Sequence, residues 1–124
     1  MRRFLLMAIA SAAISPVAAS AQPGEARGRI LFLQCQACHT LEKGGKHKTG
    51  PNLHGIFGKK AASQAGFNYS PQLQKWGMVW TPQTMDKWLH RPAALVPGNR
   101  MAFGGVMKEP DRQVLIQYMQ AKTR

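Results

Sequence analysis

Cysteine is scarce in this 124-residue chain, which contains only Cys35 and Cys38. A disulfide between two cysteines so close together would close a very short loop, and it would restrict the unfolded chain little. Its contribution to stability would therefore be small, even in an exported protein. We expect the two cysteines to serve a chemical purpose instead.

Acidic residues are also few, because 5 Asp and Glu stand against 17 Lys and Arg, for a formal net charge of +12. Such a surplus favours acidic partners, and nucleic acid is the usual first candidate. The sequence lacks a basic cluster interleaved with aromatic residues, and the export signal described next also disfavours nucleic acid. We expect partners with acidic docking surfaces and no nucleic acid, with a merely solvated basic surface as the simple alternative.

Long hydrophobic runs are missing, and the apolar run of residues 4–14 is short for a membrane span. Two arginines precede this run, Pro16 interrupts it, and Ala19-Ser20-Ala21 follows with the small residues of a signal-peptidase site. We expect residues 1–21 to be a cleaved signal peptide and Gln22–Arg124 to form one exported domain. Retention of the leader as a membrane anchor is the less favoured alternative.

Strand-like alternation is absent too, and the recognisable patterns are helical. With 12 glycines and 8 prolines, a domain of this size has little apolar surface to bury, and a flat cofactor would supply part of its core. Apolar residues at helical spacing predict a helix over residues 25–36. Caps, prolines and N-terminal acids predict further helices from Ser70-Pro71, from Thr81-Pro82 to Arg91-Pro92, and from Glu109-Pro110-Asp111 onward. Loops are predicted over residues 43–51, 50–66 (an Ω-type loop) and 97–105.

The segment Cys35-Gln36-Ala37-Cys38-His39 has the C-x-x-C-H spacing of covalent haem attachment. In a helix the two sulfurs emerge on one face, so both can bond to the porphyrin while His39 offers a ring nitrogen to the iron. A redox dithiol would require a βαβ context, and the histidines do not form the second ligand pair of a zinc site. Haem attachment is favoured, with a haem-free zinc or dithiol module as the alternative.

The second iron ligand decides what such a haem does, because an open site binds gases or peroxide whereas a strong ligand favours electron transfer. Methionines on apolar helical faces are better explained by packing. Met101 differs, since it lies in the glycine-rich loop 97–105, where the backbone can approach a flat cofactor closely. Met107 is its main rival, and the pattern alone favours Met101 only slightly. A haem peroxidase or gas sensor is the alternative function.

Several blocks of the sequence match one known family closely: Cys35–Thr40, Glu42–Gly58, Pro97-Gly98 with Met101, and Leu115–Tyr118. They resemble the class I cytochromes c, particularly the mitochondrial and α-proteobacterial (cytochrome c2-like) carriers. The resemblance extends over essentially all of Gln22–Arg124. It implies an all-α cytochrome c fold, with helices and Ω-type loops wrapped around one covalent haem c.

The same resemblance implies roles for individual residues. Cys35 and Cys38 would hold the haem covalently, and His39 and Met101 would be the axial ligands of its iron. The Pro51 carbonyl would accept a hydrogen bond from His39 and orient its ring. The remaining haem environment would comprise Tyr69 and Trp80 at a propionate, Lys59 in place of the usual arginine there, Trp88 in place of the usual tyrosine beside the methionine sulfur, and Phe103.

The implied function is single-electron transfer by a soluble, monomeric periplasmic carrier, which is not an enzyme and has no small-molecule substrate. Its partners would be a reductase such as a bc1-type complex and an acceptor such as a terminal oxidase or a reaction centre, in a respiratory or related chain. The sequence departs from the family around the haem edge, where several lysine positions read Gln34, Ala93, Ala94, Arg100 and Met107. We expect docking there to depend more on apolar contact and less on charge.

Overall fold

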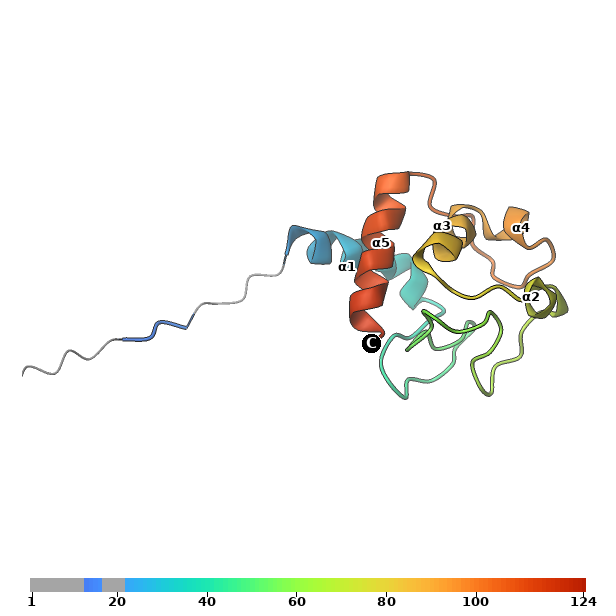
Figure 1. The fold of residues 1–124 in the computed structure, drawn as a ribbon, viewed down its shortest axis with the longest axis horizontal. Coiled ribbons are helices and arrows are strands. Elements are labelled where there is room, and N and C mark those ends of the chain that lie inside the picture. The colour runs from blue at the N-terminus through green and yellow to red at the C-terminus, as the bar shows by residue number, and fades with distance from the viewer. Residues whose placement is uncertain (1–12, 17–21) are drawn as a thin grey trace, which may run out of the picture.

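The computed structural model describes residues 13–16 and 22–124. The predicted signal peptide, with its cleavage site after Ala21, lies largely outside these residues. The described chain forms helices α1 (Pro23–Gln36), α2 (Pro71–Trp76), α3 (Pro82–His90), α4 (Pro92–Leu95) and α5 (Glu109–Lys122) (Figure 1). Over these residues the only β-type pairing is an isolated antiparallel bridge between Lys60 and Val79. The fold is all-α, as predicted.

Local signals set the starts of the helices. Each begins with a proline within its first two positions, where the missing N–H has no helical partner to lose. The Ser70 side chain accepts a hydrogen bond from the backbone N–H of Leu73 at the start of α2, and Thr81 and Thr84 form a capping box at the start of α3. These two predicted starts are confirmed.

Helix α4 was not expected. The sequence interpretation used Arg91-Pro92 only as the end of α3, but Pro92 also occupies the first position of a new one-turn helix. The extended backbone of Arg91 is the C-cap of α3 and the N-cap of α4. A residue before proline is pushed out of the helical region, so one helix ends there while the next begins.

The first and last helices cross, and Figure 1 shows α1 and α5 in contact although they lie at opposite ends of the sequence. Gly28 is buried at the crossing, where its lack of a side chain admits Tyr118. The Phe32 and Tyr118 rings pack with their centroids 5.9 Å apart. Ion pairs flank the crossing: Arg27 with Asp111 at 2.9 Å and Lys122 with Glu25 at 2.6 Å.

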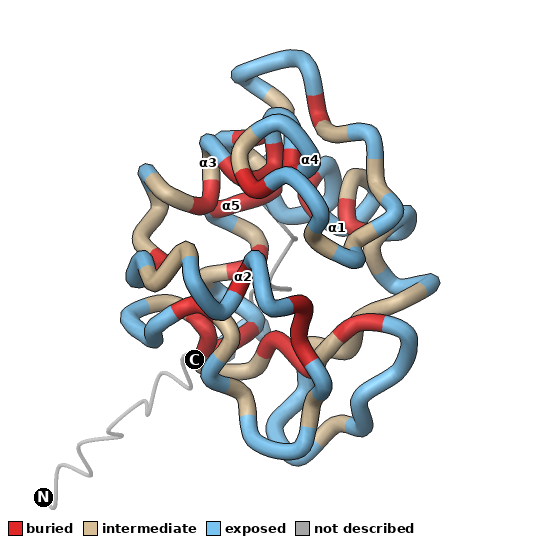
Figure 2. Tube along the Cα trace, turned by 90° about the vertical axis from the view of Figure 1, so that its right-hand side faces the viewer, coloured by how far each residue is buried: buried red, intermediate tan, exposed pale blue. Residues whose placement is uncertain are grey.

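Between α1 and α2 the chain forms a long loop that closes on itself through His47. Its Nε2 lies 2.7 Å from the carbonyl oxygen of Ala65, and its Nδ1 accepts a hydrogen bond from the backbone N–H of Asn52 at 2.9 Å. Leu53 and Ile56 are buried beneath this loop. Figure 2 shows buried segments on the inner side of such loops as well as in the helices. None of the helices in residues 22–124 is long and apolar enough to span a membrane.

Candidate functional site

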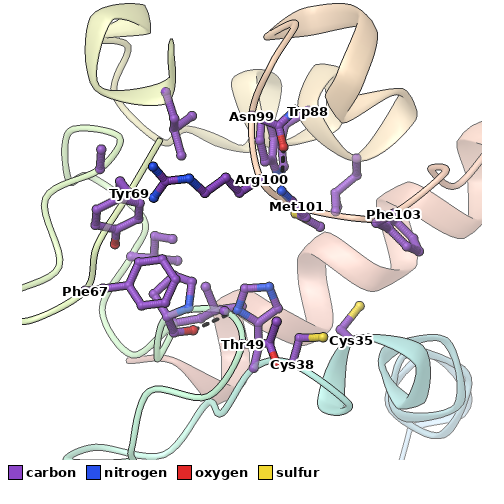
Figure 3. Close-up of a pocket in the computed structure, with 18 of the residues that line it drawn as sticks. Cys35, Cys38, Thr49, Phe67, Tyr69, Trp88, Asn99, Arg100, Met101 and Phe103 are labelled. Carbon is purple, nitrogen blue, oxygen red and sulfur yellow. Dashed lines mark hydrogen bonds between the residues drawn. The ribbon is translucent and has the colours of Figure 1, made fainter. Parts of the chain in front are cut away.

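A largely apolar cavity lies at the centre of the fold, and almost every residue singled out from the sequence lines it. In Figure 3, Cys35, Cys38 and Thr49 lie on one side and Met101 lies opposite, beside Trp88. The lining includes these sequence-predicted residues: Cys35, Cys38, His39, Pro51, Tyr69, Trp80, Trp88, Met101 and Phe103. Lys59 is not among the lining residues.

His39 is held in one orientation and one tautomer. Its Nδ1 lies 2.7 Å from the carbonyl oxygen of Pro51, and because a carbonyl can only accept, Nδ1 donates and Nε2 keeps its lone pair. Gly50 packs directly against the imidazole, and a Cβ there would come within 2.7 Å of Nδ1. Burial lowers the pKa of His39; the Pro51 hydrogen bond opposes this shift and the Lys48 charge adds to it. The result is a neutral imidazole with a free nitrogen, which is the form that binds metals.

The two cysteines are free and half-buried, one helical turn apart. The backbone N–H groups of Cys38 and His39 both donate to the carbonyl oxygen of Cys35, at 3.0 and 2.9 Å, which keeps both thiols on the cavity side. Burial raises the pKa of the Cys35 thiol to about 11, and Cys38 adds to the shift. A redox-active dithiol needs a lowered pKa, so this environment disfavours the dithiol alternative.

The loop that carries Met101 is fixed at its near end by Asn99. The Asn99 side-chain oxygen accepts a hydrogen bond from the backbone N–H of Met101 at 2.8 Å. Its amide donates to the carbonyl oxygens of Pro92 and Val96 at 3.1 and 2.9 Å, which joins the loop to α4. Sequence reasoning missed Asn99, although an Asn two residues before a key side chain is the spacing of a local side-chain-to-backbone turn.

The far end of the same loop is fixed by Arg112 of α5. This buried guanidinium donates to the carbonyl oxygens of Val106 and Met107 at 3.0 and 2.9 Å. It also forms an ion pair with Asp86 of α3 at 2.8 Å, and the backbone N–H of Val106 donates to Leu89 at 2.7 Å. Arg112 therefore ties the Met101 loop to two helices, and it too was missed.

The predicted propionate-side residues form a connected group around Gln64. The Tyr69 hydroxyl accepts a hydrogen bond from the backbone N–H of Gln64 at 3.2 Å, and burial raises its pKa. Lys59 donates to the Gln64 side-chain oxygen at 3.0 Å, and its ammonium lies outside the cavity wall. Trp80 and Trp88 are buried in the wall, with ring centroids 5.5 Å apart. The Lys59 ammonium thus reaches the site through Gln64, while the Lys59 carbonyl oxygen accepts a hydrogen bond from the backbone N–H of Trp80 at 2.8 Å.

Comparison with known proteins identifies the family of this chain. The family model described as "Cytochrome c" matches residues 25–122. The chain belongs to the cytochrome c family. It is 45% identical over 96 residues to a cytochrome c of Kluyveromyces lactis, covering 77% of this chain and 87% of the relative. It is 40% identical over 106 residues to a cytochrome c of Arabidopsis thaliana, covering 85% and 95% of the two chains. A cytochrome c2 of Agrobacterium tumefaciens is 40% identical over 97 residues, covering 76% and 87%.

Cytochromes c carry electrons and bind one covalent haem c with its iron. Because the chain belongs to this family, the all-α architecture described above is the cytochrome c fold. The residues of this cavity suit that cofactor. The free thiols of Cys35 and Cys38 lie on one side of the cavity and the thioether of Met101 lies on the other (Figure 3), and the His39 imidazole, whose Nδ1 is bonded to Pro51, also lines it. The wall between them is mostly apolar, as a porphyrin requires. The prediction of a haem c cytochrome is confirmed at the level of family, fold and cofactor.

Proposed function

We propose that this protein is a soluble periplasmic electron carrier in which Cys35 and Cys38 attach the haem and His39 and Met101 ligate its iron. The observation that carries this assignment is the cavity itself, which holds the C-x-x-C-H turn on one side and the thioether of Met101 on the other. When bound, haem c supplies an iron that accepts and releases one electron.

The protein's own residues prepare the site for that role. The Pro51 carbonyl orients the imidazole of His39 and makes its free nitrogen a better donor. Asn99 and Arg112 hold the Met101 loop from both ends, so the thioether can stay in place when the charge of the iron changes. The apolar wall excludes water, which favours the reduced state and raises the potential.

The wider haem environment is assigned on the same basis. Tyr69 and Trp80 line the cavity and would hydrogen-bond a propionate. Trp88 lies beside Met101 and would lie behind the methionine sulfur, and Phe103 lies at the opposite end of the cavity from Tyr69 (Figure 3). Lys59 would act on the propionate side indirectly, through its hydrogen bond to Gln64. An indole N–H donates but cannot accept, so Trp88 supports a different hydrogen-bond pattern from a tyrosine.

The carrier would work as a monomer between a reductase such as a bc1-type complex and an acceptor such as a terminal oxidase or a reaction centre. It would catalyse no reaction of its own. Removal of residues 1–21 takes away Arg2 and Arg3 and lowers the formal net charge from +12 to +10, and this surplus supports acidic docking surfaces on both partners. The relative named cytochrome c2 and the signal-peptide pattern of residues 1–21 support a periplasmic location.

Spectroscopy of the exported protein tests the assignment. We expect a c-type pyridine haemochrome spectrum, a far-red sulfur-to-iron band in the ferric protein, and slow carbon monoxide binding to the ferrous protein. Met101→Ala should abolish the band and admit carbon monoxide rapidly, whereas the control Met107→Ala should do neither. Rapid carbon monoxide binding by the unaltered protein would favour a gas sensor or peroxidase, and absence of haem would favour a zinc or dithiol module.

A further inference from the structure

A second exposed surface contains apolar and basic side chains from the end of α2 and the residues that follow it. Met78 and Val79 are 48% and 43% exposed, which is unusual for large apolar residues. Exposed Lys60 pairs with Val79 through the antiparallel bridge, and exposed Lys75 lies at the end of α2, three residues before Met78. We call Lys60, Lys75, Met78 and Val79 the Met78 patch.

The charge around the Met78 patch has one sign. The sequence contains no Asp or Glu between Glu42 and Asp86, so the segments that build the patch contribute only cations. Asp86 itself is paired with Arg112, and Glu25 and Asp111 are paired with Lys122 and Arg27 at the α1–α5 crossing. An apolar centre with a basic rim fits a protein partner that offers apolar contact inside an acidic rim.

A run of tryptophans connects the Met78 patch to the cavity. Trp76 is half-buried and directly follows Lys75, and its ring centroid lies 5.2 Å from that of Trp80. Trp80 lines the cavity and packs against Trp88, which also lies 6.5 Å from Trp76. Electrons tunnel more readily through contacting rings than across gaps, so these indoles provide a continuous route from the surface to the haem pocket.

We propose that the Met78 patch is a second docking surface, for an acidic one-electron redox protein, and that Trp76 and Trp80 connect it to the haem pocket. This proposal rests on the proposed carrier function. One electron would leave the partner's reduced centre, oxidising it by one electron, and would be accepted by the haem that Cys35 and Cys38 would hold, whose iron supplies the one-electron couple. No bond forms or breaks, and no proton moves.

The first experiment maps binding without electron transfer. Isotope-labelled ferric protein is titrated with an oxidised 2Fe–2S ferredoxin of the plant type, an acidic one-electron protein, at low ionic strength. We expect amide shifts at Lys60 and over residues 75–79. Lys60→Glu with Lys75→Glu should remove them, whereas Lys43→Glu with Lys87→Glu, which changes net charge equally, should not. Shifts confined to the haem rim, equal loss in both variants, or binding of anionic lipid vesicles alone at this patch would overturn the proposal.

The second experiment measures reduction of the ferric protein by reduced ferredoxin. The double reversal at Lys60 and Lys75 should slow the second-order rate by about tenfold at low ionic strength. Trp76→Leu should preserve the binding shifts but lower the electron-transfer rate, with Trp76→Phe intermediate; an unchanged rate would overturn the role of Trp76. If ascorbate reduces the protein normally and these variants have no effect on the rate with ferredoxin, the second docking surface is refuted and the carrier function is not. If ascorbate cannot reduce the protein, the carrier function itself is refuted.

Discussion

Gly28 and Tyr118 touch where the first and last helices cross, so closely that a Cβ on Gly28 would overlap the Cβ of Tyr118 and come within 2.9 Å of its Cγ. The Tyr118 Cβ is fixed to its backbone and cannot swing away. Gly28→Ala should therefore push α1 and α5 apart and destabilise the protein by about 3 kcal/mol, as overpacking in a core does. Denaturant unfolding measures this change.

Gly24, on the same helix, provides the matched control, because nothing lies within 4 Å of a Cβ built there. Gly24→Ala should be neutral or stabilising by up to about 1 kcal/mol, since alanine favours the helix. If both variants lose the same stability, the helix backbone rather than the crossing explains the effect of Gly28→Ala.

The ion pair between Glu25 and Lys122 predicts a pH dependence. The hydrogen bond from Lys122, with its charge, lowers the pKa of Glu25 from the ordinary 4.5, and the same pair raises the pKa of Lys122 from 10.5. An acid whose pKa is lowered in the folded state stabilises that state at pH values above its unfolded pKa, and this stabilisation is lost as the pH falls through the folded pKa. A base whose pKa is raised in the folded state stabilises that state at pH values below its unfolded pKa, and this stabilisation is lost as the pH rises through the folded pKa.

The Glu25→Gln variant should therefore have a lower melting temperature than the unaltered protein at pH values between about 5 and 10, where both partners are charged. The difference in melting temperature should disappear as pH falls below the ordinary pKa of Glu25. High salt should also reduce it, since the pair is exposed. A difference that persists undiminished at pH 3 would contradict this account.

Arg112 should stabilise both the fold and the methionine ligation. Arg112→Met removes the donor of the carbonyl groups of Val106 and Met107 and the cation that pairs with Asp86, which keeps only its hydrogen bond from Gln113. Loss of one partner of a largely buried pair costs about 3 kcal/mol. Because these carbonyls end the Met101 loop, the far-red band should also be lost at lower temperature than in the unaltered protein.

Arg27→Met is the control, since Arg27 also pairs with an aspartate, but its side chain is 54% exposed. That substitution should cost at most about 1 kcal/mol and leave the far-red band unchanged relative to global unfolding. Arg112 would be only a structural residue if its variant lost the band and the fold together at one temperature.

Methionine ligation should persist to unusually high pH. The resemblance to class I cytochromes c implies that a nearby lysine would replace the methionine in alkali. Ala94 and Arg100 stand at the positions of those lysines here, and arginine remains protonated. Ala94→Lys should lower the pH at which the far-red band disappears by about one unit, equivalent to about 1.4 kcal/mol. Gln117→Lys, on the exposed side of α5, should not. Loss of the band from the unaltered protein at mildly alkaline pH would refute the prediction.

Docking at the haem rim should depend only weakly on salt. Ala93, Ala94 and Met107 are exposed there and carry no charge. Electron-transfer rates with a bc1-type complex should fall by less than about tenfold as the Debye length shrinks from about 10 Å at 0.1 M to about 3 Å at 1 M. Met107→Lys should steepen the dependence. A steep fall with the unaltered protein would show that other charges dominate the encounter.

Sequence reasoning succeeded where the cause is local. Prolines and hydroxyl caps lie beside the turns that they start, so α2 and α3 were predicted at Ser70-Pro71 and Thr81-Pro82. It failed at α4 because Pro92 ends one helix and begins another, and a single turn has no periodicity to detect. The residues of the C-x-x-C-H turn lie together in the sequence, and Met101 stood out by the glycines around it.

The residues that hold the site in place could not be read in the same way. Arg112 acts on carbonyl groups and on Asp86, which only the packing of α3 against α5 brings within reach. The role of Lys59 at a propionate stays a prediction, and its hydrogen bond to Gln64 depends on how the loop folds. Such contacts are set by tertiary geometry, and residue type alone does not determine them.

The pairing of α1 with α5 also has a consequence for biosynthesis. Glu25 and Lys122 are separated by 97 positions, and Arg27 and Asp111 by 84, so the helix that carries the haem-attachment turn meets its partner only after nearly the whole chain has been made. Contacts of such long range form late and slowly. We therefore expect haem attachment to precede the packing of α1 against α5, and a truncation that removes α5 would leave α1 without the helix it packs against.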